Sequence, residues 1–306
     1  MAAGAVSLTG AARLWSYGQT AISGPDIHFP TAARERLAVA SWPFRAFING
    51  PHNQDRDTNK PGMDLREFCA KVKERFTVSG VEPLSDHFPS TDRRYLESFR
   101  EALDKAAVRV VDIPVSSSAS FYSHDPAVRK KAVKTGQKWI DVAVTLGSPN
   151  VRISIAQAPD VKPDVAVTAE ALRPLADYAG SKNVILNLEN DDLLSEDAFF
   201  IVKVIEAVNH PYLHALPDFC NSMLTGDEAF NYKAVSAMFG KAFAICHVKD
   251  SEVAEDKKLY RVDLKKTFAI LKASGFRGYC SMEFEGQGDP YQGTEKLISA
   301  SLQELS

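Results

Sequence analysis

The stretch VILNLEN, residues 184–190, decides the fold. Its residues are mostly apolar and β-compatible, and they form a run rather than an alternation, which is typical of a parallel strand buried on both faces. The strand ends on the carboxylate of Glu189. The same pattern, a buried strand followed by one side chain that can bind a metal ion, recurs three times downstream. Those strands end at Asp218, His247 and Glu283.

The spacing of these strand ends predicts a barrel. The intervals are 29, 29 and 36 residues, about the length of one strand, one helix and a return loop. Four earlier segments, at 37–41, 80–84, 108–115 and 150–153, also read as strands and alternate with helical patterns. Eight such units predict an α/β fold, the closed (β/α)8 TIM barrel. We therefore expect one barrel domain over residues 37–306, after an N-terminal extension over residues 1–36.

The composition excludes several classes of protein. The chain has 306 residues, of which 45% are hydrophobic and 25% charged, as in ordinary globular proteins. Its formal net charge of −3 offers no basic field for a phosphate backbone, so we expect no nucleic-acid partner. No apolar run reaches the roughly 18 residues that span a bilayer, so we expect no membrane association. The four cysteines form no CxxC pair and predict buried free thiols.

The first dozen residues leave the localisation open. Residues 1–12 are small and apolar, like the later part of a secretory signal with an Ala-rich cleavage zone, but no basic n-region precedes them. Either the protein is exported to the periplasm and residues 1–12 are a trimmed signal, or it is cytoplasmic and they are a plain tail.

The four strand-end residues predict a metal site, because side chains from several strands converge at the C-terminal rim of a barrel. Three carboxylates and one imidazole suit one divalent ion, with Mn²⁺ ahead of Mg²⁺, Co²⁺ and Zn²⁺. The site then keeps a formal charge of about −1, so a carboxylate can also act as a base. A single acid at a strand end is more often a helix cap, but four in succession favour a joint site. The set is Glu189, Asp218, His247 and Glu283.

Four short motifs carry a family resemblance. They are NLEN (187–190), PDFCN (217–221), HVKD (247–250) and SMEFEG (281–286). From residue 37 onward the chain resembles the sugar phosphate isomerase/epimerase family with a xylose isomerase-like TIM barrel, which includes ketose 3-epimerases, hydroxypyruvate isomerase and inosose dehydratase. The resemblance implies that the four strand-end residues bind one divalent metal ion. It also implies that Glu189 and Glu283 move the proton at the carbon next to a carbonyl.

This chemistry predicts an enzyme acting on a small-molecule sugar or polyol. A metal ion that chelates a carbonyl and its neighbouring hydroxyl acidifies the C–H bond between them, and two carboxylates then isomerise or epimerise the sugar through an enediolate. With a leaving group β to the carbonyl, the same site gives a lyase that acts on a keto-sugar or keto-glycoside. An alternative of another class is a sugar-binding or subunit protein without turnover, and a homo-oligomer stays open. A DNA-repair endonuclease on this barrel would need more histidines and a basic face.

Three candidates for substrate binding lie near the metal motifs. Arg152, near the end of the fourth strand, can bind a substrate oxygen or pair with a ligand carboxylate. Lys249 points to the same side of its strand as His247 and can polarise a carbonyl or balance charge. Asn221 stands three residues after Asp218, where ketose epimerases of the family usually have a histidine.

Two further candidates lie in the first third of the chain. His87, at the end of the second strand, is either an acid or base or a structural loop residue. Trp42 can form an apolar wall for a sugar ring, together with Phe44 and Phe121, or all three belong to the core. The charged run 250–258 is expected to be a solvated loop.

Overall fold

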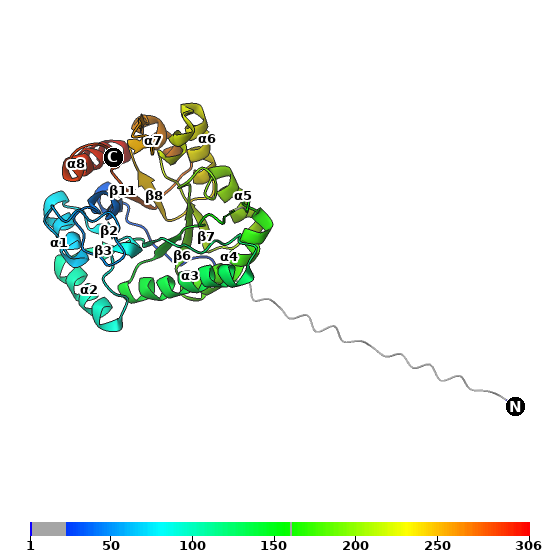
Figure 1. The fold of residues 1–306 in the computed structure, drawn as a ribbon. Helices are drawn as coiled ribbons and strands as arrows, with labels where there is room; N and C mark the ends of the chain where they lie inside the picture. Colours follow the sequence, from blue (N-terminus) through cyan, green and yellow to red (C-terminus); the bar gives the residue numbers. More distant parts are fainter. Residues whose placement is uncertain (2–22, 160) are drawn as a thin grey trace.

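The computed structural model describes residue 1, residues 23–159 and residues 161–306, and it shows a (β/α)8 barrel (Figure 1). The proposed signal remnant, apart from residue 1, lies outside the described residues. The barrel strands are β1 (Leu37–Ala40), β2 (Gly80–Glu82), β3 (Arg109–Val110), β4 (Pro114–Val115), β5 (Asn150–Ile153), β6 (Ile185–Glu189), β7 (Leu213–Leu216), β8 (Ile245–Val248) and β11 (Tyr279–Met282). The predicted fold class is confirmed.

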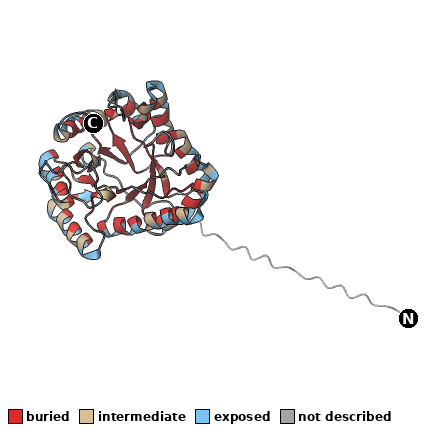
Figure 2. Cartoon of the chain, in the orientation of Figure 1, coloured by how far each residue is buried: buried red, intermediate tan, exposed pale blue. Residues whose placement is uncertain are grey.

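The helices form an outer ring, with their buried faces toward the strands (Figure 2). They are α1 (Leu65–Phe76), α2 (Arg93–Ala106), α3 (Pro126–Leu146), α4 (Val165–Ser181), α5 (Ala198–Val208), α6 (Glu228–Phe239), α7 (Leu264–Ala273) and α8 (Pro290–Leu305). The short 3₁₀ helices are η1 (Ala33–Arg36), η2 (Trp42–Phe44), η3 (Ser85–His87) and η4 (Asn221–Thr225). Among the described residues, no helix is long and apolar enough to cross a membrane.

Local sequence signals set the limits of the longest helix. Asp125 caps α3 by accepting a hydrogen bond from the backbone N–H of Ala127, and Pro126 occupies the first turn, where its missing N–H costs nothing. Gly147 ends the helix with a φ of 76°, which glycine adopts without steric strain. These two capping residues, Asp125 and Gly147, therefore set the limits of α3.

All barrel strands pair in parallel. One sheet runs β3-β2-β1-β11-β8 and the other β4-β5-β6-β7. Isolated bridges join Ala215 to Ala242 and Asp218 to His247, which connects β7 with β8. On the other side of the barrel, the two sheets are joined by the third barrel strand, which consists of β3 and β4.

The expected continuous strand over 108–115 is two short segments. The backbone N–H of Val111 still donates to Val81 on one side, and that of Arg152 donates to Ile113 on the other. Pro114 has no N–H to donate, so the ladder is interrupted where the chain changes neighbours. The two segments β3 and β4 together make one barrel strand.

The segment after residue 22 covers the N-terminal end of the barrel. Phe29 packs edge-on against Phe243 and Tyr279, with ring centroids 5.5 and 5.6 Å apart. Both rings lie at or just before the start of their strands, β8 and β11. The opposite end of the barrel, formed by the C-terminal ends of the strands, is not covered by this segment and carries the candidate site.

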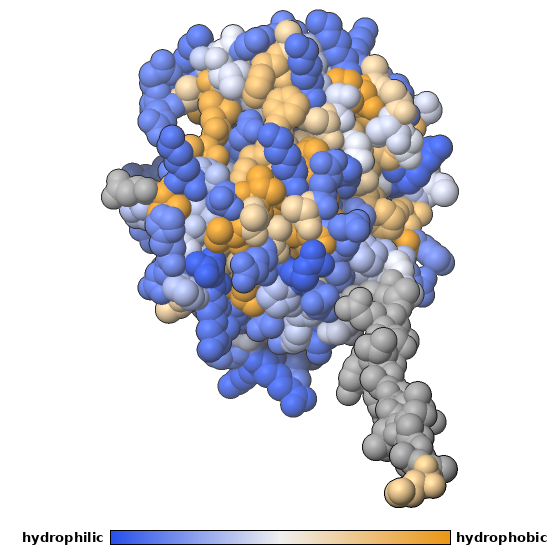
Figure 3. Space-filling view, turned by 90° about the vertical axis from the view of Figure 1, so that its right-hand side faces the viewer, coloured by the Kyte–Doolittle hydropathy of each residue, from blue (hydrophilic) through white to orange (hydrophobic). Residues whose placement is uncertain are grey.

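The outer surface mixes side chains of both kinds. Figure 3 shows apolar residues interspersed with hydrophilic ones over one face. Large hydrophobic residues in the described part of the chain are exposed at Val144, Leu193 and Leu194, besides Met1. The four cysteines are buried and free, as predicted. A homo-oligomer stays a prediction.

Candidate active site

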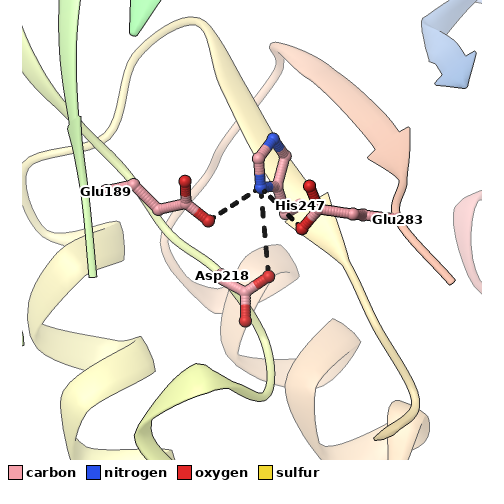
Figure 4. A group of neighbouring side chains, drawn as sticks. All are labelled: Glu189, Asp218, His247 and Glu283. Atoms are coloured by element: carbon pink, nitrogen blue, oxygen red, sulfur yellow. Dashed lines mark hydrogen bonds and ion pairs between the residues drawn. The ribbon is translucent and has the colours of Figure 1, made fainter. Parts of the chain in front are cut away.

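Four side chains from consecutive strand ends meet at the C-terminal rim (Figure 4). Glu189 ends β6, Asp218 lies just beyond β7, His247 lies within β8 and Glu283 follows β11. One ligand atom of each lies within 4.8 Å of the others, and all four residues are buried. The Nδ1 atom of His247 lies 2.8 Å from Glu189 Oε1, 3.3 Å from Glu283 Oε2 and 4.0 Å from Asp218 Oδ2. Sequence reasoning predicted all four as metal ligands, and that role stays a proposal.

The donor set fits a divalent metal ion. Asp218 Oδ1 accepts hydrogen bonds from the backbone N–H groups of Cys220 and Asn221, at 2.8 and 2.7 Å, which orient the carboxylate. Its Oδ2 is buried and has no hydrogen-bond partner in the described part of the chain. A buried carboxylate oxygen without a partner is suited to bind a cation. Three carboxylates and one imidazole suit a hard or borderline ion.

Without a metal ion, positive side chains partly balance this acidic group. Burial, together with Glu189 and Glu283, raises the pKa of Asp218 to about 8, against the opposite effect of Lys249. Burial alone would lower the pKa of His247, but the surrounding carboxylates, above all Glu189, raise it well above its ordinary value. Without a metal ion, a protonated His247 therefore supplies positive charge among the carboxylates. A bound metal ion would supply that positive charge instead.

Lys249 lies beside the four residues and is buried. Its Nζ is 2.8 Å from Asn221 Oδ1 and 3.3 Å from Glu283 Oε2. Two further carboxylates, Glu252 at 2.8 Å and Glu285 at 3.0 Å, complete its surroundings. The geometry supports charge balance for Lys249 and leaves its contact with a substrate a proposal.

The expectation of a solvated loop over 250–258 is wrong in part. The strand β9 (Ser251–Val253) pairs antiparallel with β10 (Leu259–Arg261) and makes a hairpin at the rim. The hairpin turns the side chain of Glu252 inward, where it is buried against Lys249. Composition alone could not show this, because a charged run is ordinarily exposed.

Arg152 holds Glu189 from the other side. Its Nε lies 3.0 Å from Glu189 Oε2, and its Nη2 lies 2.6 Å from Asp191 Oδ2 and 3.6 Å from Glu196 Oε2. Burial raises the pKa of Glu196 to about 8, against the opposing effect of Arg152. The guanidinium is thus engaged with protein carboxylates, which favours the pairing interpretation of Arg152 over direct binding of substrate.

A cavity of about 320 Å³ opens above the four residues. Arg152, Asn221, Lys249 and Trp42 line it, together with the candidate metal ligands Glu189, His247 and Glu283. The Trp42 indole N–H donates to Glu285 Oε2 at 3.0 Å, and the Arg45 guanidinium stacks on its ring at 4.0 Å. Phe44 and Phe121 are fully buried in the core and do not belong to this wall.

The structure places His87 outside the cavity lining, contrary to its proposed contact with substrate. It is fully buried, and its Nδ1 lies 2.8 Å from the hydroxyl of Ser41. Burial, helped by the charge of Arg45, lowers the pKa of His87 to about 4. The residue is therefore a neutral structural histidine at neutral pH.

This burial predicts a pH-dependent contribution to stability. The folded-state pKa of His87 lies below the ordinary value of 6.5, so its contribution is present above pH 6.5 and is lost as the pH falls toward 4. We expect wild type to lose up to about 3 kcal/mol more than His87→Gln between about pH 7 and pH 4. Urea unfolding at both pH values measures this; equal losses in the two proteins would refute it.

Sequence reasoning missed several functional neighbours, of which Glu82 is the most central. Its Oε1 lies 2.8 Å from His247 Nε2. Glu82 ends β2, as Glu189 ends β6, so the same strand-end signal was present. Glu285 was also missed, although it lies in the SMEFEG motif, two residues after Glu283.

Fold and site together define the class of α/β barrels with a buried group of carboxylates and an imidazole at the C-terminal rim that could hold a metal ion. Residues 70–305 match the family model described as xylose isomerase-like TIM barrel, and the chain belongs to this family. The resemblance drawn from the four motifs is thereby confirmed at the family level.

Solved structures show the same fold at low sequence identity. A xylose isomerase domain protein from Planctomyces limnophilus is 22% identical with a TM-score of 0.61, covering 75% of this chain and 88% of its own. A D-allulose 3-epimerase from Methylomonas sp. is 18% identical with a TM-score of 0.67, covering 91% and 100%. A xylose isomerase-like TIM barrel protein from Mycobacterium smegmatis, in complex with magnesium, is 16% identical with a TM-score of 0.66, covering 90% and 99%. No curated protein matches the chain.

Proposed function

We propose that the protein is a divalent-metal-dependent sugar isomerase or epimerase that abstracts a proton next to a carbonyl. One observation carries this proposal: the carboxylates of Glu189 and Glu283 approach the same buried centre from opposite sides, at the base of the cavity (Figure 4). Two bases that face each other across a bound sugar can remove a proton from one face and return one to the other. Family membership supports the same type of chemistry.

The two carboxylates are held in different ways, which suits paired roles. Glu189 is fixed by Arg152 at 3.0 Å and by the side-chain N–H of Asn221 at 3.3 Å. Burial would raise the pKa of Glu283, but His247 and Lys249 lower it well below its usual range, so this carboxylate is ionised. Both residues therefore keep fixed positions, and Glu283 is charged as a base requires.

A divalent ion held by the four residues would polarise the carbonyl and the adjacent hydroxyl of the substrate. We propose Mn²⁺ first, with Mg²⁺, Co²⁺ and Zn²⁺ as alternatives. The related structure from Mycobacterium smegmatis is a complex with magnesium, which supports the choice of a divalent ion.

The charge of the cavity favours an uncharged sugar or polyol over a sugar phosphate. Its lining carries seven carboxylates against only three basic side chains, Arg152, Lys249 and His247. A bound dication still leaves an excess of negative charge, which repels a phosphate group. Neutral ketoses and keto-glycosides are therefore the substrates to test first.

The test is solvent deuterium incorporation into a panel of ketoses, keto-sugars and keto-glycosides. We expect exchange of one C–H next to the carbonyl that requires added Mn²⁺ and stops with a chelator. A product of unchanged mass apart from deuterium establishes an isomerase or epimerase, whereas loss of water or of an aglycone establishes a lyase. Sugar binding without any exchange would overturn the proposal of an enzyme and would support the alternative of a sugar-binding protein without turnover.

A further inference from the structure

A pair of buried acids adjoins the four candidate metal ligands and has no part in the proposed proton transfer. Glu82 ends β2, and Asp112 lies between β3 and β4, on the neighbouring barrel strand. Both residues have no exposed surface. Glu82 Oε2 and Asp112 Oδ2 have no hydrogen-bond partner within the described ranges. Buried acids in this position need an explanation, because an uncompensated carboxylate in a barrel is costly.

The contact between Glu82 and His247 explains why an acid is buried here. The two ring nitrogens of His247 face different groups: Nδ1 faces the three strand-end carboxylates, and Nε2 lies 2.8 Å from Glu82 Oε1. A nitrogen that binds a cation must offer its lone pair, so the ring proton must then reside on the other nitrogen. Only Nε2 is then left to carry the proton, and its N–H donates to Glu82.

We propose that Glu82 is a positioning residue of the metal site: by accepting the hydrogen bond from His247 Nε2–H, it fixes the tautomer and the ring orientation that present Nδ1 to the metal ion. This rests on the proposed role of His247 as a metal ligand. Glu82 also lines the cavity, but both of its oxygens are turned to protein groups or buried. It is therefore not assigned a role as a base.

Protonation of Asp112 reduces the repulsion between the two buried carboxyl groups. Burial, and next the neighbouring Glu82, raise the pKa of Asp112 well above its ordinary value, which favours the protonated form. Its proton can lie between the two otherwise unpaired oxygens, Glu82 Oε2 and Asp112 Oδ2. Asn187 Nδ2 holds the remaining oxygen, Asp112 Oδ1, at 3.4 Å.

The experiment measures the Kd for Mn²⁺ by isothermal titration calorimetry. We expect Glu82→Ala to weaken binding about 10–100-fold, the usual effect of losing such a partner, and Glu82→Gln to weaken it less, because its amide oxygen still accepts the hydrogen bond. Asp112→Asn keeps a donor toward Glu82 and should bind nearly as wild type does. Glu255→Ala, an exposed residue of the rim hairpin, is the control.

A second readout separates positioning from a general effect on folding. With ¹⁵N-labelled histidine and diamagnetic Zn²⁺, wild type should show His247 protonated on Nε2 and metal-bound on Nδ1, and Glu82→Gln should keep this signature. Wild-type affinity for Mn²⁺ in Glu82→Ala, or a metal ion bound to Nε2, would overturn the positioning role of Glu82 but not the proposed function. A wild-type protein that binds no divalent ion would overturn the proposed function as well.

Discussion

Replacing Glu283 by Gln is expected to slow proton exchange at the substrate carbon by at least about 100-fold. Gln is nearly isosteric with Glu, but its amide cannot accept a proton at neutral pH. Glu283 is buried, is ionised beside His247 and Lys249, and lies on the opposite side of the centre from Glu189. The variant also removes one of three carboxylates from the metal group, so we expect a weaker affinity for Mn²⁺.

The measurement is the rate of deuterium incorporation at saturating Mn²⁺, which separates lost chemistry from lost metal. Glu255→Gln, the same substitution at an exposed site, is the matched control and should exchange at the wild-type rate. Full exchange activity in Glu283→Gln would remove Glu283 from its proposed role and leave Glu189 as the only base to be considered.

Replacing Arg152 by Leu is expected to destabilise the fold by about 3–5 kcal/mol and to slow exchange. Arg152 is buried among the carboxylates of Glu189, Asp191 and Glu196. Removing its charge leaves Glu189 buried without its cation, a much larger penalty than the loss of an exposed pair. Glu189 also loses the contact that fixes its carboxylate.

Urea unfolding at neutral pH measures the loss of stability. Arg93→Leu is the control, because Arg93 pairs with Glu97 on an exposed helix surface and should change the free energy of unfolding by less than about 1 kcal/mol. Combining Arg152→Leu with Glu189→Gln should recover part of the loss, since the carboxylate that Arg152 contacts at 3.0 Å is then replaced by a neutral amide. Wild-type stability in Arg152→Leu would contradict the interpretation of this cluster as a buried ion-pair network.

The fold could be predicted because each of its determinants is local. Runs such as 184–190 indicate buried parallel strands, and Asp and Gly residues at the ends of α3 fix its limits. The four strand-end residues followed directly, because the C-terminal ends of parallel strands must meet at one rim. The interruption of the third strand was missed, since Pro114 was treated as part of a continuous run.

The neighbours of the site could not be predicted in the same way. Glu82 contacts His247 across 165 residues of sequence, and only the closed barrel brings β2 opposite β8. Glu252 resembles any other residue of a charged run until the hairpin turns its side chain toward Lys249. His87 was proposed at the rim because it follows a strand, but its side chain turns away from the cavity and into the protein. Side-chain direction after a strand depends on the loop, which sequence patterns do not specify.

The central claim, that Glu189, Asp218, His247 and Glu283 hold one divalent ion that supports proton exchange, is tested most directly by measuring both properties on the same samples. Elemental analysis gives the metal content of wild type and Asp218→Asn, and deuterium incorporation gives their exchange rates. We expect about one ion per chain in wild type, less in the variant, and exchange in proportion to bound metal. Exchange that persists after the metal ion is removed, or a wild-type protein that takes up no divalent ion, would contradict the account.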